Sequence, residues 1–253
     1  MKILRKSSDG RIALIDEVRG FSILCMVVYH LFYDLVYIFS VPIPIFTSPL
    51  INGLQEIFAG LFILISGASC AFSRNNLKRG IFCFSFGMIL TAATFFFMPD
   101  ELIVFGILHL LGMSMILYAI SRKLLAKIPA AAAIPLFVFL FAVSYDVSYG
   151  FLGIYKVFTI SLPSALYRTN YLAPLGFINA AFFSSDYFPL LPWLFLFIAG
   201  SYIGKLFKKM PPDSFAARSH VPLLSFVGRN TFIIYLVHQP IILGILYIIF
   251  RFI

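Results

Sequence analysis

The stretch that decides the fold runs from residue 15 to residue 34 and reads IDEVRGFSILCMVVYHLFYD. Between Arg19 and His30 its side chains are almost all apolar or small. A helix needs about 20 mainly apolar residues to cross the hydrocarbon layer of a bilayer, which is about 30 Å thick. We therefore predict a membrane-spanning helix over residues 18–40.

The rest of the chain has the same character. Of its 253 residues, 61% are apolar and only 11% are charged, and the mean hydropathy is +0.99. Soluble domains carry roughly a quarter charged residues, so this composition excludes a water-soluble globule and a disordered chain. We predict an all-α integral membrane protein, one domain over residues 1–253, with about seven spanning helices. The six further spans are expected at 52–72, 80–97, 102–120, 129–146, 188–206 and 223–250.

Basic residues indicate the orientation of these spans. Fourteen of the 19 Lys and Arg residues precede the first span or lie in alternate connections, and cytoplasmic connections are the ones enriched in Lys and Arg. We expect the N-terminus in the cytoplasm and the long connection 147–187 outside, where it holds a short re-entrant or interfacial piece. The net charge of +9 then reflects membrane topology, and no nucleic-acid partner is predicted.

Three ionisable residues fall on one face of the first span. Arg19 and His30 are 11 residues apart. At about 100° per residue this is close to three turns, or roughly 16 Å along the axis. Asp34 lies one turn beyond His30 on the same face. Ionisable groups inside a membrane are costly, so each is a candidate functional residue.

A carboxylate beside a histidine fixes its tautomer and raises its basicity. We therefore predict that His30 is a catalytic general base supported by Asp34, with Arg19 as a donor-side anchor at the cytoplasmic surface. The structural alternative is a histidine that only hydrogen-bonds to a neighbouring helix.

Other spans carry isolated polar residues. Glu56 enters the second span at a depth similar to the carboxylate of the first, so we expect it near the same cluster. His109, in the fourth span, serves either packing or function. His238 precedes Gln239 and Pro240 in the last span. Because Pro240 leaves a backbone carbonyl without its donor, we expect His238 or Gln239 to satisfy that kink.

Two helix ends carry polar groups that suit substrates. The segment Gly228-Arg229-Asn230 is expected to begin the last helix on the cytoplasmic side, where free N–H groups and Arg229 favour an anion such as phosphate. On the outer side, Asp186 is a helix-capping residue and Trp193 is typical of the interfacial belt, although the same helix mouth suits a polar acceptor. The three cysteines fall in apolar runs, so we predict no disulfide framework and no metal site.

These polar residues leave the function class open. Carboxylates and histidines inside a membrane also suit a proton-coupled transporter or flippase for a polar or lipid-linked solute. The sequence has no internal repeat of the kind that many carriers show. A membrane-embedded scaffold is a third possibility, for which the buried charges should tolerate apolar replacement.

Several of these motifs resemble those of known membrane enzymes. Arg19 followed after ten residues by His30 is similar to the first-helix pattern of acyltransferase-3-type membrane enzymes. The wider arrangement resembles more closely the heparan-alpha-glucosaminide N-acetyltransferase catalytic domain family and its bacterial relatives. The stretches that carry this resemblance are IDEVRG (15–20), FILISG (62–67), DYFPLLPW (186–193), GRNT (228–231) and YLVHQP (235–240).

This resemblance implies an acyl-CoA-dependent N- or O-acetyltransferase. Acetyl-CoA would be a cytoplasmic co-substrate, with no permanently bound cofactor, and the acceptor an amino sugar or glycan hydroxyl on the extracytoplasmic side. The implied partners are acyl-CoA, a carbohydrate and the lipid bilayer, a homo-oligomer is compatible, and the expected location is a bacterial cytoplasmic membrane. The lysosomal branch carries Asn where this chain has His30, with its proposed catalytic His in the following loop, and residues 41–51 contain no His. The active histidine is therefore either His30 or not transferable from the family.

Overall fold

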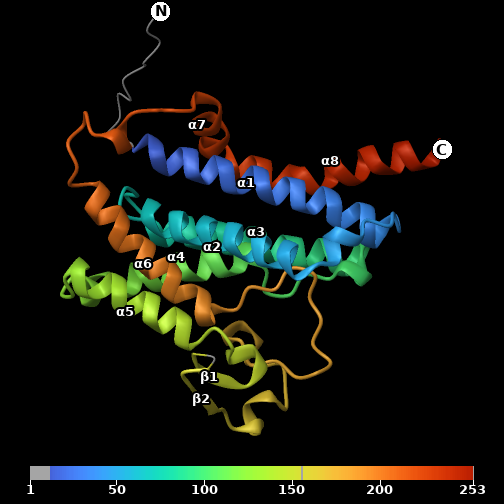
Figure 1. Cartoon of the computed structure of the whole chain (residues 1–253), viewed down its shortest axis with the longest axis horizontal. Helices are drawn as coiled ribbons and strands as arrows, with labels where there is room; N and C mark the ends of the chain where they lie inside the picture. The colour runs from blue at the N-terminus through green and yellow to red at the C-terminus, as the bar shows by residue number, and fades with distance from the viewer. Residues whose placement is uncertain (1–11, 155, 253) are drawn as a thin grey trace, which may run out of the picture. The chain divides into compact units, whose positions relative to one another are not determined.

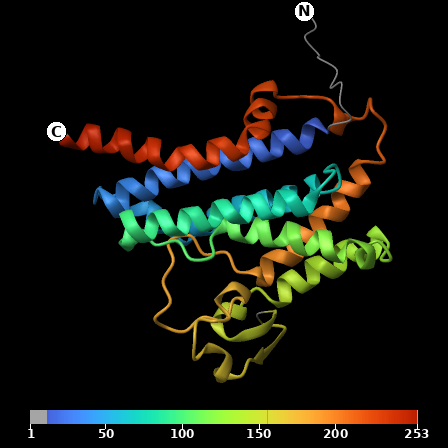
Figure 2. The ribbon, with the colours of Figure 1, turned by 180° about the vertical axis from the view of Figure 1, so that it is seen from behind.

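The computed structural model describes residues 12–154 and 156–252, which are mostly helical (Figures 1 and 2). Among these residues, seven helical segments are long and apolar enough to cross a bilayer, which confirms the predicted all-α multi-pass class. They are Ala13–Ile38, Pro49–Ser69, Asn76–Phe97, Ile107–Leu125, Ala130–Tyr149, Leu190–Phe207 and Thr231–Arg251.

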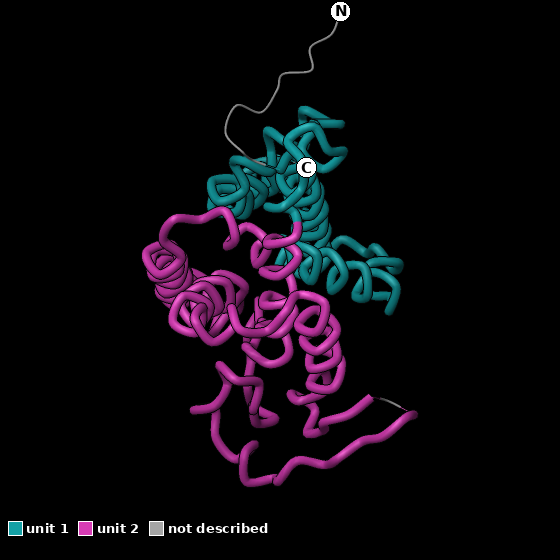
Figure 3. Tube along the Cα trace, turned by 90° about the vertical axis from the view of Figure 1, so that its left-hand side faces the viewer, with its two compact units in different colours: residues 1–65, 207–253 teal, residues 66–206 magenta. Residues whose placement is uncertain are grey.

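The chain divides into two compact units (Figure 3). The first unit joins the two ends of the chain, residues 1–65 and 207–253, and the second unit is residues 66–206. One boundary falls inside helix α2 (Pro49–Ser69). The organisation of the chain as one domain stays a prediction.

Helix α1 (Ala13–Tyr33) organises the first unit. It continues into a π-helical turn, η1 (Asp34–Ile38), and a 3-10 turn, η2 (Pro44–Thr47). The C-terminal end of the chain supplies η7 (Phe215–Ala217), α7 (Pro222–Arg229) and α8 (Thr231–Arg251). Both α7 and α8 pack against α1 (Figures 1 and 2).

Helices α1 and α8 run in the same direction. Near the start of α1, Arg19 contacts Gly228, and further along, His30 contacts His238, so residue numbers rise together on both sides. Because successive spans cross the membrane in alternating directions, the first and last spans are parallel when the number of spans is odd. The described structure therefore agrees with seven predicted spans.

Two glycines bring the backbones of α1 and α7 into direct contact. A Cβ at Gly20 would overlap the carbonyl oxygen of Leu224, and a Cβ at Gly228 would overlap that of Asp16. No side chain fits at either position, so only glycine allows this approach.

The single helix predicted over residues 223–250 is wrong. Helix α7 ends at Arg229, α8 begins at Thr231, and Asn230 between them has non-helical dihedral angles (φ −102°, ψ 12°). The Asn230 side chain donates to the Phe226 carbonyl at 2.8 Å, in place of a backbone donor. Pro240 lies inside α8 without ending it.

The second unit holds α3 (Asn76–Phe97), α4 (Ile107–Leu125), α5 (Ala130–Val143) and α6 (Leu190–Phe207), with a turn, η3 (Pro99–Glu101), between α3 and α4. Helices α3 and α4 pack closely, because Gly112 lies directly against the backbone of Phe84. The predicted start of the fourth span at residue 102 is too early. Residues 102–106 are irregular, since Phe105 has a φ of 57° and Gly106 is the N-cap of α4.

The long connection 147–187 contains a small antiparallel sheet. Strand β1 (Phe151–Ile154) pairs with β2 (Phe158–Ser161), with Gly153 opposite Thr159. The same connection holds three 3-10 turns: η4 (Val147–Tyr149), η5 (Ser164–Tyr167) and η6 (Ala173–Leu175). This strand pair stands where we expected a re-entrant or interfacial piece.

Candidate active site

Two histidines from opposite ends of the sequence meet in the first unit. The ring centroids of His30 on α1 and His238 on α8 lie 5.0 Å apart, with their planes at 55°. Tyr29 and Tyr33 contact the His30 ring at 5.9 and 6.4 Å, and Tyr235 contacts the His238 ring at 5.5 Å. His30, the predicted catalytic histidine, therefore pairs with His238, which we expected to hydrogen-bond near Pro240.

The hydrogen bonding of His238 defines its tautomer. Its Nδ1 lies 2.6 Å from the carbonyl oxygen of Tyr235, which can only accept, so Nδ1 carries the proton. In the neutral ring the lone pair is therefore on Nε2. This atom is buried and has no hydrogen-bond partner among the described residues, and the same holds for Oε1 of Gln239. Buried polar atoms are normally paired, so these two acceptors suit a ligand that donates hydrogen bonds.

Asp34 is fully buried beside this pair, and its partner comes from the facing helix. Its Oδ1 accepts a hydrogen bond of 2.7 Å from Nε2 of Gln239. Asp34 is also the first residue of the π-helical turn η1. Such turns are rare in proteins, and those that occur are frequently found at functional sites. The predicted support of His30 by Asp34 does not take the form of a hydrogen bond, because within the described residues His30 makes ring contacts only. Sequence spacing reveals neighbours on one helix but not the residue opposite.

The predicted use of these side chains at Pro240 is wrong. Pro240 leaves the carbonyl of Leu236 without its usual donor. His238 instead bonds the carbonyl of Tyr235, and Gln239 bonds Asp34. Both residues are therefore directed to the α1–α8 interface.

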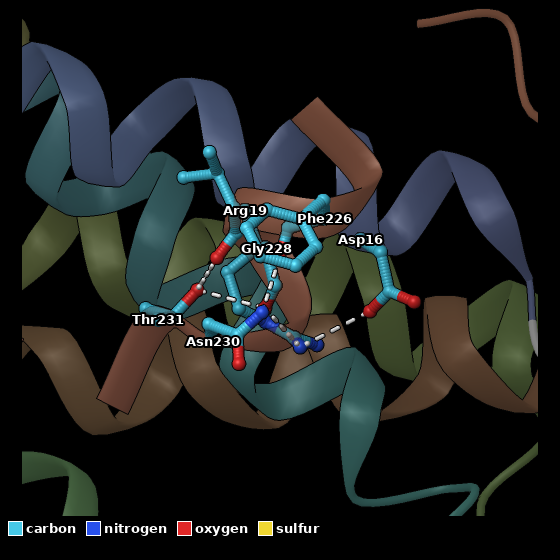
Figure 4. A network of polar contacts seen from close by, with 7 residues as sticks. Asp16, Arg19, Phe226, Gly228, Asn230 and Thr231 are labelled. Carbon is cyan, nitrogen blue, oxygen red and sulfur yellow. Dashed lines mark hydrogen bonds and ion pairs between the residues drawn. The ribbon is translucent and has the colours of Figure 1, made fainter. Parts of the chain in front are cut away.

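Arg19 lies at the joint between α7 and α8 (Figure 4). Its Nη1 donates to Oδ1 of Asp16 at 3.2 Å and to the carbonyl oxygen of Gly228 at 3.3 Å. The hydroxyl of Thr231 donates to the same carbonyl at 2.8 Å. A cation at the C-terminal end of α7 is favourable, because the carbonyl groups there carry partial negative charge.

The expected anion site at residues 228–230 has a different character. Gly228 and Arg229 end one helix before Asn230 begins the next, so Gly228 offers a carbonyl oxygen to Arg19 where N–H groups were expected. Asn230 uses its amide within this joint (Figure 4). The side chain of Arg229 is exposed at the surface.

Sequence reasoning missed Glu17, a carboxylate only 5% exposed. Its Oε1 accepts four hydrogen bonds from the α6–α7 connection and α7. The donors are Ser219 Oγ at 2.8 Å, His220 N at 2.7 Å, Val221 N at 2.9 Å and Ser225 Oγ at 3.0 Å. The only signal in the sequence is an acid at the start of an apolar helix, because its partners lie about 200 residues away.

His109 belongs to the second unit, where the fold uses both of its ring nitrogens. Nδ1 accepts from the backbone N–H of Gly106 at 3.2 Å, so Nε2 carries the proton and lies 3.3 Å from the Thr91 hydroxyl. That hydroxyl donates to the carbonyl of Ile103 at 2.8 Å. His109 is 3% exposed and caps the start of α4. The structure therefore favours the structural role of His109.

Asp186 also stabilises the start of α4, not the start of α6 as its sequence position suggested. Its Oδ2 accepts from the backbone N–H of Ile107 at 3.0 Å. Ser184 supports it, accepting from the N–H of Val104 and donating to the Asp186 carbonyl. Next to them the Tyr187 hydroxyl donates to the Ala173 carbonyl at 2.7 Å, and burial raises the pKa of this hydroxyl.

The two remaining candidates are Trp193 and Glu56. Trp193 is 8% exposed and packs against Phe141 and Phe188 in the second unit, with ring centroids 5.4 and 5.5 Å away, so it is a core residue where an interfacial one was expected. Glu56 belongs to the first unit, but its side chain is exposed. The structure therefore does not place Glu56 in the buried cluster around Asp34.

Residues 11–240 match the family described as heparan-alpha-glucosaminide N-acetyltransferase, catalytic, so the match covers most of the 253 residues. No curated protein and no solved structure matches the chain. The matched range includes both histidines of the pair, Asp34 and Gln239. The chain belongs to the heparan-alpha-glucosaminide N-acetyltransferase catalytic family, a family of membrane acetyltransferases.

Proposed function

We propose that this chain transfers the acetyl group of cytoplasmic acetyl-CoA to an amino sugar or a glycan hydroxyl on the extracytoplasmic side of the membrane. Membership of an acetyltransferase family supports the reaction class. Seven apolar helices among the described residues support the membrane setting. We further propose His30 as the general base.

The observation that carries this proposal is the imidazole pair. His30 and His238 face each other at 5.0 Å, and His238 directs an unprotonated Nε2 into buried surroundings. Gln239 adds a second buried acceptor oxygen. An amine or hydroxyl substrate donates the hydrogen bonds that the His238 nitrogen and the Gln239 oxygen accept. A substrate without N–H or O–H groups would leave both atoms unpaired.

In the proposed reaction, His30 removes a proton from the acceptor as its nitrogen or oxygen attacks the thioester carbonyl carbon. The new C–N or C–O bond forms, the C–S bond breaks, and its electron pair leaves on the coenzyme A sulfur. The proton then passes from His30 to that sulfur, which restores the neutral imidazole. His238 orients the attacking group through Nε2, and the bond between Gln239 and Asp34 fixes α8 beside α1.

The donor is proposed to approach from the predicted cytoplasmic end of α1. There Arg229 is exposed and available for the phosphate groups of coenzyme A, while Arg19 and Asn230 hold the α7–α8 joint next to it. A guanidinium group binds phosphate with charge-assisted hydrogen bonds, which suits this assignment.

The test is acetyl transfer by purified protein in lipid nanodiscs, with labelled acetyl-CoA and a panel of amino sugars. General-base catalysis contributes about 10²–10⁴-fold, so His30→Gln should lower kcat by that factor with donor binding retained. His220→Gln is the matched control, because His220 is an exposed histidine on the α6–α7 connection of the same unit. Near-normal transfer by His30→Gln would remove His30 from the mechanism. Proton-linked solute uptake without consumption of acetyl-CoA would contradict the proposed reaction.

A further inference from the structure

We propose that Glu17 is a positioning residue that sets the register of α8 against α1, and with it the spacing of His30 and His238. This inference rests on the proposed function, in which that imidazole pair is the catalytic site. Glu17 itself touches neither histidine ring. Its effect would pass through α7 and the joint that follows it.

The first step is the attachment of α7 to α1 at its N-terminal end. Oε1 of Glu17 accepts from two consecutive backbone N–H groups, of His220 and Val221, directly before α7 begins at Pro222. The hydroxyls of Ser219 and Ser225 donate to the same oxygen. A carboxylate at a helix N-terminus binds N–H groups that the helix leaves unpaired, and the positive end of the helix dipole favours its charge.

The second step is the attachment of α7 along its length and at its C-terminal end. Gly20 of α1 lies against the backbone of Leu224, and Gly228 of α7 lies against the backbone of Asp16. Arg19 then donates to the Gly228 carbonyl. Helix α7 has only eight residues, so contacts at both ends and in between leave it one position on α1.

The third step links the position of α7 to that of His238 on α8. One residue, Asn230, separates α7 from α8, and the joint is closed by the Thr231 hydroxyl on the Gly228 carbonyl and by the Asn230 amide on the Phe226 carbonyl (Figure 4). His238 follows Thr231 by seven residues, about two helical turns. A shift of α7 along α1 therefore moves His238 past His30. Misplacement of a catalytic group by about 1 Å can cost on the order of 10² in rate.

The experiment measures the spacing without relying on catalysis. Cys25, Cys70 and Cys83 are replaced by Ala, and His30→Cys with His238→Cys supplies two thiols for a short bifunctional methanethiosulfonate reagent. The rate of cross-linking in nanodiscs is compared among proteins with Glu17, Glu17→Ala and Asp213→Ala. Asp213 is the matched control, because it is an exposed acid on the same α6–α7 connection. We expect Glu17→Ala to slow cross-linking by about tenfold, because the rate depends steeply on the spacing and orientation of the two thiols. Asp213→Ala should leave the rate unchanged.

A kinetic arm uses the protein with both histidines. Glu17→Ala should lower kcat by about tenfold to 10²-fold with the KM for acetyl-CoA changed by less than about twofold, because the donor contacts remain. Glu17→Gln should restore most of kcat, because its amide oxygen still accepts from the two backbone N–H groups. Unchanged cross-linking and unchanged kcat in Glu17→Ala would overturn the proposal.

Two further outcomes are decisive. If Glu17→Ala does not fold, the milder pair Ser219→Ala with Ser225→Ala removes two of the four donors. Slower cross-linking in that pair supports the proposal, and an unchanged rate overturns it. If the wild-type chain transfers no acetyl group, the proposed function fails, while the cross-linking comparison still decides whether Glu17 positions α8.

Discussion

His109 and His238 are both buried histidines in apolar helices, one in each unit, and they differ in the hydrogen bonds that their rings make. His109 bonds through both ring nitrogens, to the N–H of Gly106 and to the hydroxyl of Thr91. His238 bonds through Nδ1 to its own helix, and Nε2 remains a buried acceptor without a partner among the described residues. The hydrogen bonds of a buried histidine, more than its burial or its position in a span, therefore separate a structural histidine from a candidate for chemistry.

Replacing each histidine by leucine should show the largest difference in stability. His109→Leu leaves the N–H of Gly106 buried and unpaired, which costs about 1–3 kcal/mol of the free energy of unfolding. His238→Leu removes one bond to a carbonyl within its own helix and should cost less than about 1 kcal/mol. Thermal unfolding of both variants in one detergent measures this contrast. Equal losses for the two variants would show that the unpaired nitrogen is no guide to function.

Asp186, like His109, stabilises the start of α4. Asp186 caps α4 through the N–H of Ile107, so Asp186→Ala should destabilise the protein by about 0.5–2 kcal/mol, as expected for the loss of a helix cap. Asp186→Asn should recover most of that loss, because an amide oxygen still accepts from the N–H group. Unfolding midpoints of the two variants give the answer, and equal destabilisation by Ala and Asn would contradict a capping role.

The spanning helices could be predicted from the sequence because a bilayer demands long apolar stretches. The face shared by Arg19 and His30 could also be predicted, since helical periodicity fixes it, and both residues do face the C-terminal helices. The partners on those helices could not be predicted, because spacing along one helix does not show which residue lies opposite. Gln239 therefore took the place expected for His30 as the partner of Asp34.

The same limit explains the unpredicted role of Glu17 and the break at Asn230. The donors to Glu17 lie more than 200 residues further along the chain. The break at Asn230 depends on the docking of α7 on α1, where Gly20 and Gly228 bring the two backbones together. Both features arise from tertiary contacts, which the pattern of residues along the chain does not show.

A double-mutant cycle on kcat for acetyl transfer tests most directly whether His30 and His238 act as one catalytic unit. The variants are His30→Gln, His238→Gln and the double variant, each measured with folded protein in the same nanodiscs. Groups that act as a unit show strongly non-additive effects, so the double variant should fall within about threefold of the slower single variant. Losses that multiply in the double variant, or single variants that match the wild type, would show that the two histidines do not act as one catalytic unit.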